Sequence, residues 1–187
     1  WIQKFTKKDS LRLIFIVGWF GKETVGDKAI LAGIVDCYKS EFDNKVEFVI
    51  VILYPFITKS TCYELSKHAT VVSTKTFELL AYAKSSDIIV MGGGPLMDLN
   101  ELYIPLIGFK VAKAYRKKTV VFGCGIGPLK FEKFESAVKD ILLHSDEIKL
   151  RDHKSIEIAK SYGITTEIEF FGDPAKKYLK VINDNLV

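Results

Sequence analysis

Arginine is scarce in this sequence. Of the 27 basic residues among 187, three are arginine, namely Arg12, Arg116 and Arg151. The net charge is a mild +4, and the lysines are spread along the chain. Nucleic-acid-binding surfaces need clustered basic residues, so we expect no nucleic-acid partner. Because lysine is the usual base here, an arginine at the end of a strand is a candidate for planar recognition of a carboxylate or phosphate.

Cysteine and long apolar runs are also limited. The three cysteines, Cys37, Cys62 and Cys124, form no CxxC pair. This odd count favours reduced thiols and predicts a cytoplasmic location. The longest apolar run, residues 48–57, contains a proline. It is well short of the roughly 18 residues that span a bilayer, so we expect a protein that is not integral to a membrane. No His, Cys and carboxylate spacing indicates a metal site.

Apolar runs alternate with helical patterns along the chain, and 48% of the residues are hydrophobic. Short apolar strands separated by helices indicate βαβ units and a parallel sheet covered on both faces. We therefore expect one doubly wound, Rossmann-like α/β domain over residues 1–187, with a mainly parallel sheet. The expected strands are 11–17, 46–53, 87–91, 119–123, 147–151 and 167–171. The expected helices are 28–41, 76–85, 102–117, 133–145 and 152–162.

Glycine-rich motifs follow nearly every expected strand. One such motif is explained by a tight turn, but five at the carboxyl edge of a parallel sheet favour a ligand site. Glycines let the backbone approach a ligand, and the N–H groups of a following helix bind anions. The spacing matches neither a dinucleotide fingerprint nor a P-loop. The motifs are Gly18-Trp19-Phe20-Gly21 with Gly26-Asp27, Gly92-Gly93-Gly94 closing on Asp98, Gly123-x-Gly125-x-Gly127-Pro128, Arg151-Asp152 and Gly172-Asp173-Pro174.

In order and content these motifs resemble the polysaccharide pyruvyl transferase family. The resemblance extends over roughly residues 11–175 and includes Arg151-Asp152-x-x-Ser155 between the Gly-Ile-Gly-Pro and Asp-Pro motifs. It implies an enzyme that moves the enolpyruvyl unit of phosphoenolpyruvate onto a sugar of a cell-surface polysaccharide, without a further cofactor. The implied partners are a small-molecule donor and a saccharide acceptor. The oligomeric state stays open, with a homo-oligomer among the possibilities.

The resemblance also implies two Rossmann-like domains in a glycosyltransferase-B-like arrangement. The sequence begins at Trp1 and ends soon after the Asp-Pro motif. We therefore expect the amino-terminal half of such an enzyme, with the second domain and the catalytic general acid outside this chain. The isolated chain would then be incomplete for catalysis. Two alternatives stay open: a nucleotide-sugar-dependent glycosyltransferase domain, or a non-catalytic ligand-binding domain if the natural chain ends at Val187.

Arg151 is the first candidate for substrate binding, because a guanidinium fork fits a carboxylate or phosphate bidentately. Its alternative role is a purely structural ion pair with Asp152 or Asp173. Asp27 binds a sugar hydroxyl, helps to transfer a proton, or caps a helix. Cys124 is expected to be a buried filler and not a nucleophile. The expected substrate-binding residues are Arg151, Asp152, Asp27, Gly92, Gly93, Gly94, Gly125 and Gly127.

Overall fold

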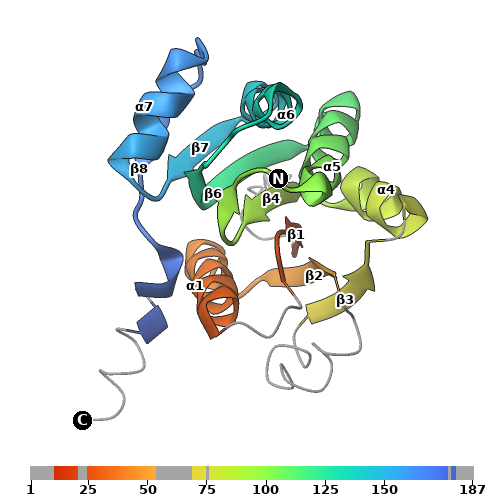
Figure 1. Cartoon of the computed structure of the whole chain (residues 1–187). Coiled ribbons are helices and arrows are strands. Elements are labelled where there is room, and N and C mark those ends of the chain that lie inside the picture. The colour runs from red at the N-terminus through yellow and green to blue at the C-terminus, as the bar shows by residue number, and fades with distance from the viewer. Residues whose placement is uncertain (1–10, 21–24, 54–68, 75, 177, 180–187) are drawn as a thin grey trace, which may run out of the picture.

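The computed structural model describes residues 11–20, 25–53, 69–74, 76–176 and 178–179. Within these residues a parallel sheet has the strand order β3-β2-β1-β4-β6-β7-β8, and the short β5 pairs with β6 (Figure 1). This confirms the α/β, Rossmann-like fold. The strands are Arg12–Val17 (β1), Val46–Ile52 (β2), Ala69–Ser73 (β3), Ile88–Gly92 (β4), Pro95–Leu96 (β5), Lys118–Ile126 (β6), Glu147–Leu150 (β7) and Ile168–Phe170 (β8). The helices are Val25–Glu41 (α1), Thr76–Ser85 (α4), Tyr103–Ala114 (α5), Glu132–Leu143 (α6) and His153–Ser161 (α7), with a 3-10 turn at Asn100–Leu102.

Helices cover both faces of the sheet. Successive side chains of a strand point to opposite faces, so Ile14 and Ile16 of β1 pack with α1 while Phe15 packs on the other face. That second face carries α4, α5, α6 and α7 (Figure 1). Phe109 of α5 and Ile141 of α6 are fully buried against it. Burial on both faces explains why the strands read as continuous apolar runs.

The order of the strands places a topological switch point at the centre of the sheet. The chain leaves β1 toward β2 and leaves β4 toward β6, so β1 and β4 flank the point where the winding direction reverses. In open α/β sheets, ligands bind outside the carboxyl ends of the strands at such a point. Because all the paired strands are parallel, their carboxyl ends share one edge of the sheet.

Strand β6 is longer than the sequence predicts. We expected it to end at Gly123, but it continues to Ile126, with a register shift between Phe122 and Cys124. Gly123 has a φ of 63°, which the absence of a side chain permits. After the bulge at Gly123, β6 pairs again with β7 at Cys124 and with β5 at Gly125. Gly125 therefore lies within a strand and not in a turn.

Two strands were not predicted. β3 lies at an edge of the sheet, and only Val72 of its residues is buried. β5 has just two residues and begins with Pro95. Neither has the apolar run that identifies a central strand.

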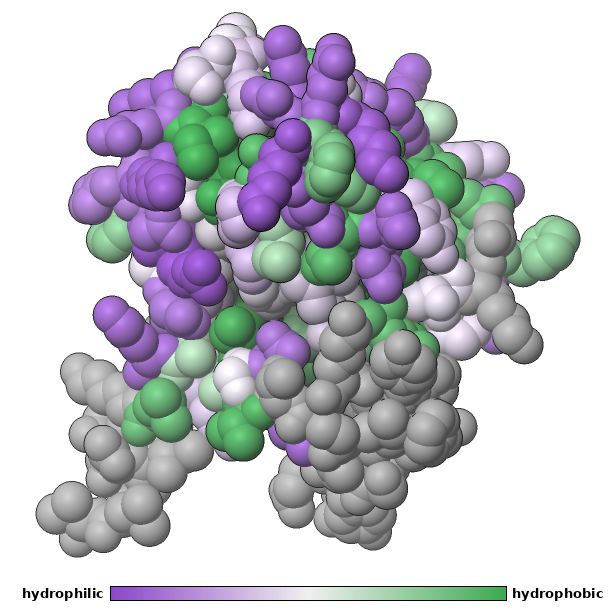
Figure 2. Space-filling model, in the orientation of Figure 1, coloured by the Kyte–Doolittle hydropathy of each residue, from purple (hydrophilic) through white to green (hydrophobic). Residues whose placement is uncertain are grey.

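The surface is mostly hydrophilic in the orientation of Figure 1, and apolar side chains appear there in separate small patches (Figure 2). Among the described helices, none combines the length and apolar character needed to cross a bilayer. Neither Cys37 nor Cys124 is part of a disulfide, whereas Cys62, like Gly21, lies outside the described residues.

Asp146 joins α5 to β6 at the amino edge of the sheet. Its Oδ2 accepts hydrogen bonds from the backbone N–H of Thr119 at 2.9 Å and from the Thr119 hydroxyl at 3.0 Å, and Lys113 pairs with its Oδ1. Burial alone would raise the pKa of Asp146. The hydrogen bonds from Lys113 and Thr119 outweigh burial and hold that pKa below its usual value.

We expect Asp146→Ala to lower the free energy of unfolding by about 1 kcal/mol at pH 7, because solvent screens the half-exposed pair but the bonds to buried Thr119 are lost. This stability is fully present above the carboxyl pKa in the unfolded chain, and it disappears as pH falls through the lower folded-state pKa. Urea unfolding of both proteins between pH 7 and pH 2 measures the difference. Asp140→Ala, which removes only an exposed pair with Lys110, is the matched control. A gap between wild type and Asp146→Ala that does not change with pH would contradict this account.

Candidate functional site

The predicted motifs lie along the carboxyl edge of the sheet. Gly18 follows β1, Gly92 ends β4, Arg151 follows β7 and Gly172 follows β8. Since these strands run parallel, the structure brings to one edge residues that are far apart in the sequence. The edge therefore combines glycine-rich backbone with charged side chains.

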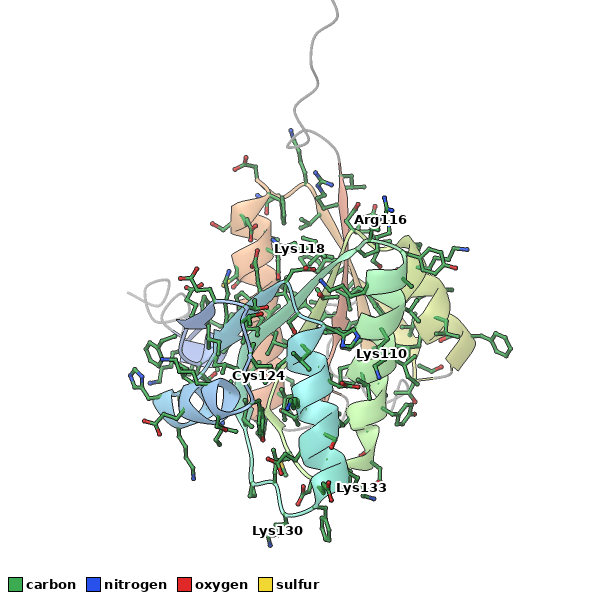
Figure 3. All side chains as sticks on the ribbon, turned by 90° about the horizontal axis from the view of Figure 1, so that it is seen from above. Lys110, Arg116, Lys118, Cys124, Lys130 and Lys133 are labelled. Carbon is green, nitrogen blue, oxygen red and sulfur yellow. The ribbon has the colours of Figure 1, made fainter. Side chains whose placement is uncertain are left out.

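The three arginines of the sequence are divided between the two edges. Arg12 begins β1, and Arg116 follows the end of α5, which places both at the amino edge. Figure 3 shows this polarity along β6: Arg116 and Lys118 lie at one end of the molecule and Lys130 at the other. Arg151 is thus the arginine at the carboxyl edge. The planar, permanently charged guanidinium of Arg151 is therefore at the edge where a ligand is expected.

The Arg151 side chain lies against β6. Its backbone N–H donates to the carbonyl of Cys124 at 2.9 Å, which aligns the end of β7 with the last residues of β6. A Cβ placed on Gly125 would lie 2.7 Å from Nη2 of Arg151 and 3.3 Å from its Cζ. The guanidinium therefore occupies the space that a side chain at Gly125 would fill. The Arg151 side chain is still 32% exposed, so it remains accessible to solvent.

Asp152 and Ser155 link Arg151 to β6. Asp152 caps α7 by accepting a hydrogen bond from the backbone N–H of Ser155 at 2.8 Å, and its Oδ1 also accepts from the Ser155 hydroxyl at 2.7 Å. Ser155 Oγ in turn accepts from the N–H of Ile126 at 2.7 Å. The Asp152 Oδ2 lies 3.7 Å from Nε of Arg151. Burial would raise the pKa of Asp152, but the bonds from Ser155 and the charge of Arg151 hold it below its usual value.

The triple glycine packs against side chains of its own chain. A Cβ on Gly93 would lie 2.7 Å from the ring of Phe20, and one on Gly94 would lie 2.7 Å from Trp19. Trp19 and Phe20 are buried, and Trp19 Nε1 donates to the carbonyl of Pro95 at 2.9 Å. We expected this loop to open a helix, but it leads into β5 instead. The glycines thus have a clear steric role, and contact with a ligand stays a prediction.

The second predicted glycine turn also differs from expectation. We expected Gly125 and Gly127 to form a cradle at a helix entrance. Gly125 belongs to β6, and α6 begins only at Glu132. Gly127 has a φ of 95°, and its N–H donates to the carbonyl of Leu96 at 2.8 Å. The N–H groups of α6 are therefore separated from these glycines by an intervening loop.

Asp27 lies in the first turn of α1, since that helix begins at Val25. In this first turn its carboxylate interacts favourably with the helix dipole. Asp27 is at the same edge as Arg151 because α1 follows β1. Its contact with a sugar hydroxyl stays a prediction.

Asp98 and Asp173, two further carboxylates at the carboxyl edge, accept hydrogen bonds from backbone N–H groups. Asp98 Oδ2 accepts from the N–H of Lys130 at 2.8 Å and so ties the segment after β5 to the loop after β6. Asp173 Oδ1 accepts from the N–H of Ala175 at 2.9 Å, which forms a local turn. Pro174 in that turn packs on Gly123: a Cβ there would lie 2.3 Å from Pro174 Cγ.

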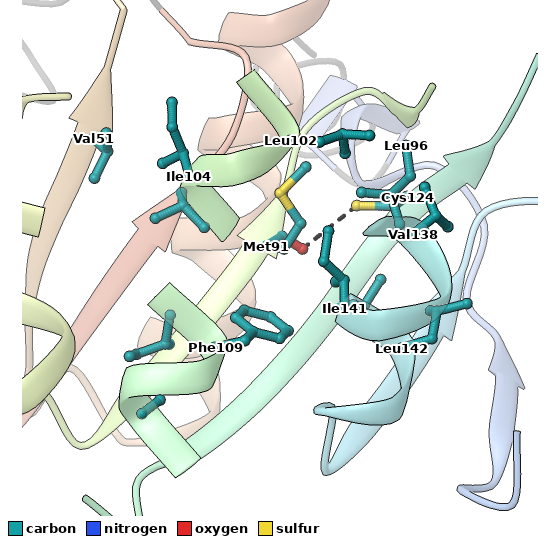
Figure 4. Packing of buried hydrophobic residues seen from close by; sticks show 14 of the residues in the cluster. Val51, Met91, Leu96, Leu102, Ile104, Phe109, Cys124, Val138, Ile141 and Leu142 are labelled. Carbon is teal, nitrogen blue, oxygen red and sulfur yellow. Dashed lines mark hydrogen bonds between the residues drawn. The ribbon is translucent and has the colours of Figure 1, made fainter. Parts of the chain in front are cut away.

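Cys124 is a structural thiol. It is fully buried among Met91, Leu96 and Val138, and its Sγ donates to the Met91 carbonyl at 3.4 Å (Figure 4). Burial raises the pKa of Cys124 to about 12, so the reactive thiolate is essentially absent at neutral pH. This agrees with the expected role of Cys124 as a small buried side chain that fills space in the core.

His153, in the first turn of α7, is exposed and stacks on Phe170 with ring centroids 4.6 Å apart.

A groove of about 550 Å³ beside this edge was not foreseen. The loop after β6 forms one wall, and α6 and α7 form the others. Tyr162 donates a hydrogen bond to Glu135 across it; burial and the Glu135 charge both raise the pKa of Tyr162. The residues come from three separate elements, so no local pattern could have indicated the groove. Its lining includes Gly127, Pro128, Leu129, Glu135, Lys154 and Tyr162.

Among the described residues, no group of three or more His, Cys, Asp or Glu side chains is placed to hold a metal ion. The chemistry that these residues offer is electrostatic. The guanidinium of Arg151 lies beside the carboxylate of Asp152 and against the backbone of Gly125, which has no side chain. Such an arrangement suits a small anion.

The comparison with protein families agrees with the motifs. No curated protein matches the sequence at a significant level. The profile of the family described as polysaccharide pyruvyl transferase matches residues 25–185, which is most of the chain and includes the Gly125–Gly127 segment, Arg151, Asp152 and Ser155. The chain belongs to the polysaccharide pyruvyl transferase family.

Proposed function

We propose that this chain binds phosphoenolpyruvate as the donor of a pyruvyl transfer to a saccharide of a cell-surface polysaccharide. The observation that carries the proposal is the position of Arg151, at the carboxyl edge and against Gly125. Phosphoenolpyruvate has a carboxylate and a phosphate, and either group matches the two parallel N–H bonds that a guanidinium donates. A cytoplasmic location, where phosphoenolpyruvate is available, fits the reduced thiol of Cys124.

In the proposed reaction a general acid protonates the methylene carbon of the enolpyruvyl unit, which leaves positive charge at the adjacent carbon and its oxygen. A hydroxyl of the sugar attacks that carbon and loses its proton. A second hydroxyl of the same sugar then attacks the same carbon, the C–O bond to phosphate breaks, and the departing phosphate takes the proton of that hydroxyl. The products are a pyruvate ketal and inorganic phosphate. Arg151 would hold the donor in position and balance its negative charge. We assign the general acid to no described residue.

The donor class can be tested by ligand-induced stabilisation of the chain. We expect phosphoenolpyruvate to raise the melting temperature by several degrees, because a ligand at 100 times its Kd stabilises the folded state by about 2.7 kcal/mol. The measurement is a thermal melt with phosphoenolpyruvate, a nucleotide sugar or neither. Lactate at the same ionic strength controls for non-specific salt effects.

The other outcomes identify the alternatives. Stabilisation by the nucleotide sugar without stabilisation by phosphoenolpyruvate would replace the proposal with a glycosyltransferase domain. No response to either compound would favour a non-catalytic domain. If phosphoenolpyruvate does bind, the matching activity assay is the release of inorganic phosphate, which must depend on an added saccharide.

A further inference from the structure

Ser155 connects two elements of the candidate site. It is 1% exposed and lies in the first turn of α7. Its hydroxyl donates to Oδ1 of Asp152 and accepts from the N–H of Ile126, both at 2.7 Å. One hydroxyl group thus joins the start of α7 to the end of β6, and both of its hydrogen-bonding functions are satisfied.

The Arg151 guanidinium lies close to both of the segments that Ser155 joins. On one side it meets Gly125, the residue before Ile126, and on the other side its Nε faces Oδ2 of Asp152 at 3.7 Å. Any movement of the β6 segment away from α7 would open the space that confines the guanidinium. Asp152 alone cannot prevent that movement, because its bond to the Ser155 N–H lies within α7.

The hydroxyl does more than helix capping requires. The cap itself is the bond from the Ser155 backbone N–H to Asp152, which any residue at position 155 can donate. The bond that a backbone cannot supply is the one to Ile126, and this bond crosses between the two elements. Without it the N–H of Ile126, which is nearly fully buried, would lack this acceptor, a costly state for a backbone donor.

We propose that Ser155 is a positioning residue that holds the end of β6 against α7 and thereby fixes the Arg151 guanidinium in its binding orientation. The consequence for donor binding rests on the function proposed above. The geometric part, which concerns the order of the guanidinium and of the Ile126 backbone, holds with or without a donor.

The test compares Ser155→Ala with Ser161→Ala, both on the full chain. Ser161 is on the same helix, but its hydroxyl donates only to the carbonyl of Ile158. Alanine also favours a helix more than serine does, so α7 should persist in both variants. We expect the Ile126 amide and the Nε–H of Arg151 to exchange with solvent at least tenfold faster in Ser155→Ala. We expect the Kd for phosphoenolpyruvate to rise about tenfold in the same variant, with Ser161→Ala unchanged.

Ser155→Thr keeps the hydroxyl, so it should recover most of the affinity even if the added methyl group lowers the melting temperature. Equal exchange at Ile126 in the two alanine variants overturns the proposal. So does faster exchange in Ser155→Ala with an unchanged Kd, because the contact would then be structural only. If the wild-type chain binds no phosphoenolpyruvate, the proposed function fails, and the two exchange rates alone decide whether Ser155 fixes the guanidinium.

Discussion

Gly18→Ala is expected to lower the free energy of unfolding by about 3 kcal/mol. Gly18 follows β1 at the centre of the sheet, where a Cβ would lie 2.0 Å from the carbonyl oxygen of Gly92. The obstacle is backbone of the neighbouring strand, so it cannot be relieved by rotating a side chain. The added methyl group must push β1 and β4 apart where the winding direction reverses.

Urea unfolding at pH 7 measures this change, and Gly108→Ala is its control. Gly108 lies in α5, and apart from its chain neighbours and the nearby backbone of that helix, no described heavy atom is within 4 Å of a Cβ built there. Alanine at that position should stabilise the chain by about 0.5–1 kcal/mol, because it reduces the freedom of the unfolded backbone. If Gly18→Ala were as stable as wild type, β1 and β4 could not be as close as the structure has them.

The sequence was sufficient to predict the fold because most of the signal is local. Buried strands such as β1 and β4 appear as short apolar runs, and α1 has apolar residues at helical spacing. The errors occur where pairing depends on distant residues. The extension of β6 past Gly123 requires a bulge, and the space above that bulge is filled by Pro174, some 50 residues later in the chain.

The candidate site was predictable to a similar extent. Arg151 and Gly125 could be assigned to the carboxyl edge because each is close to the end of an apolar run. Their mutual contact could not, because it depends on the register between β6 and β7. The same holds for Ser155: the sequence places it three residues after Asp152, but its second bond reaches Ile126 on another element. Sequence patterns locate such residues on an edge, whereas the packing of elements determines which of them meet.

Arg151→Ala is expected to weaken the binding of phosphoenolpyruvate about 100-fold, since it removes two charge-assisted hydrogen bonds. Arg151→Lys keeps the charge but loses the fork, so its loss should be about tenfold. The free energy of unfolding should change by less than about 0.5 kcal/mol, because the ion pair with Asp152 is long and partly solvated. Calorimetric titration measures the Kd. Arg116→Ala, at the opposite edge, is the control, and an equal loss in both alanine variants would show that net charge and not position determines binding.

Gly125→Ala provides the sharper form of this prediction, because it displaces the guanidinium without removing it. The new Cβ would lie 2.7 Å from Nη2 and 3.3 Å from Cζ of Arg151, and both atoms belong to the free end of a flexible side chain. The side chain can move, so the fold should persist while the affinity for phosphoenolpyruvate falls. If that loss acts through Arg151, Gly125→Ala should have almost no further effect in an Arg151→Ala background, since the two substitutions then remove the same interaction. Losses that add in the double variant would mean that Gly125 contacts the donor independently, through its own backbone.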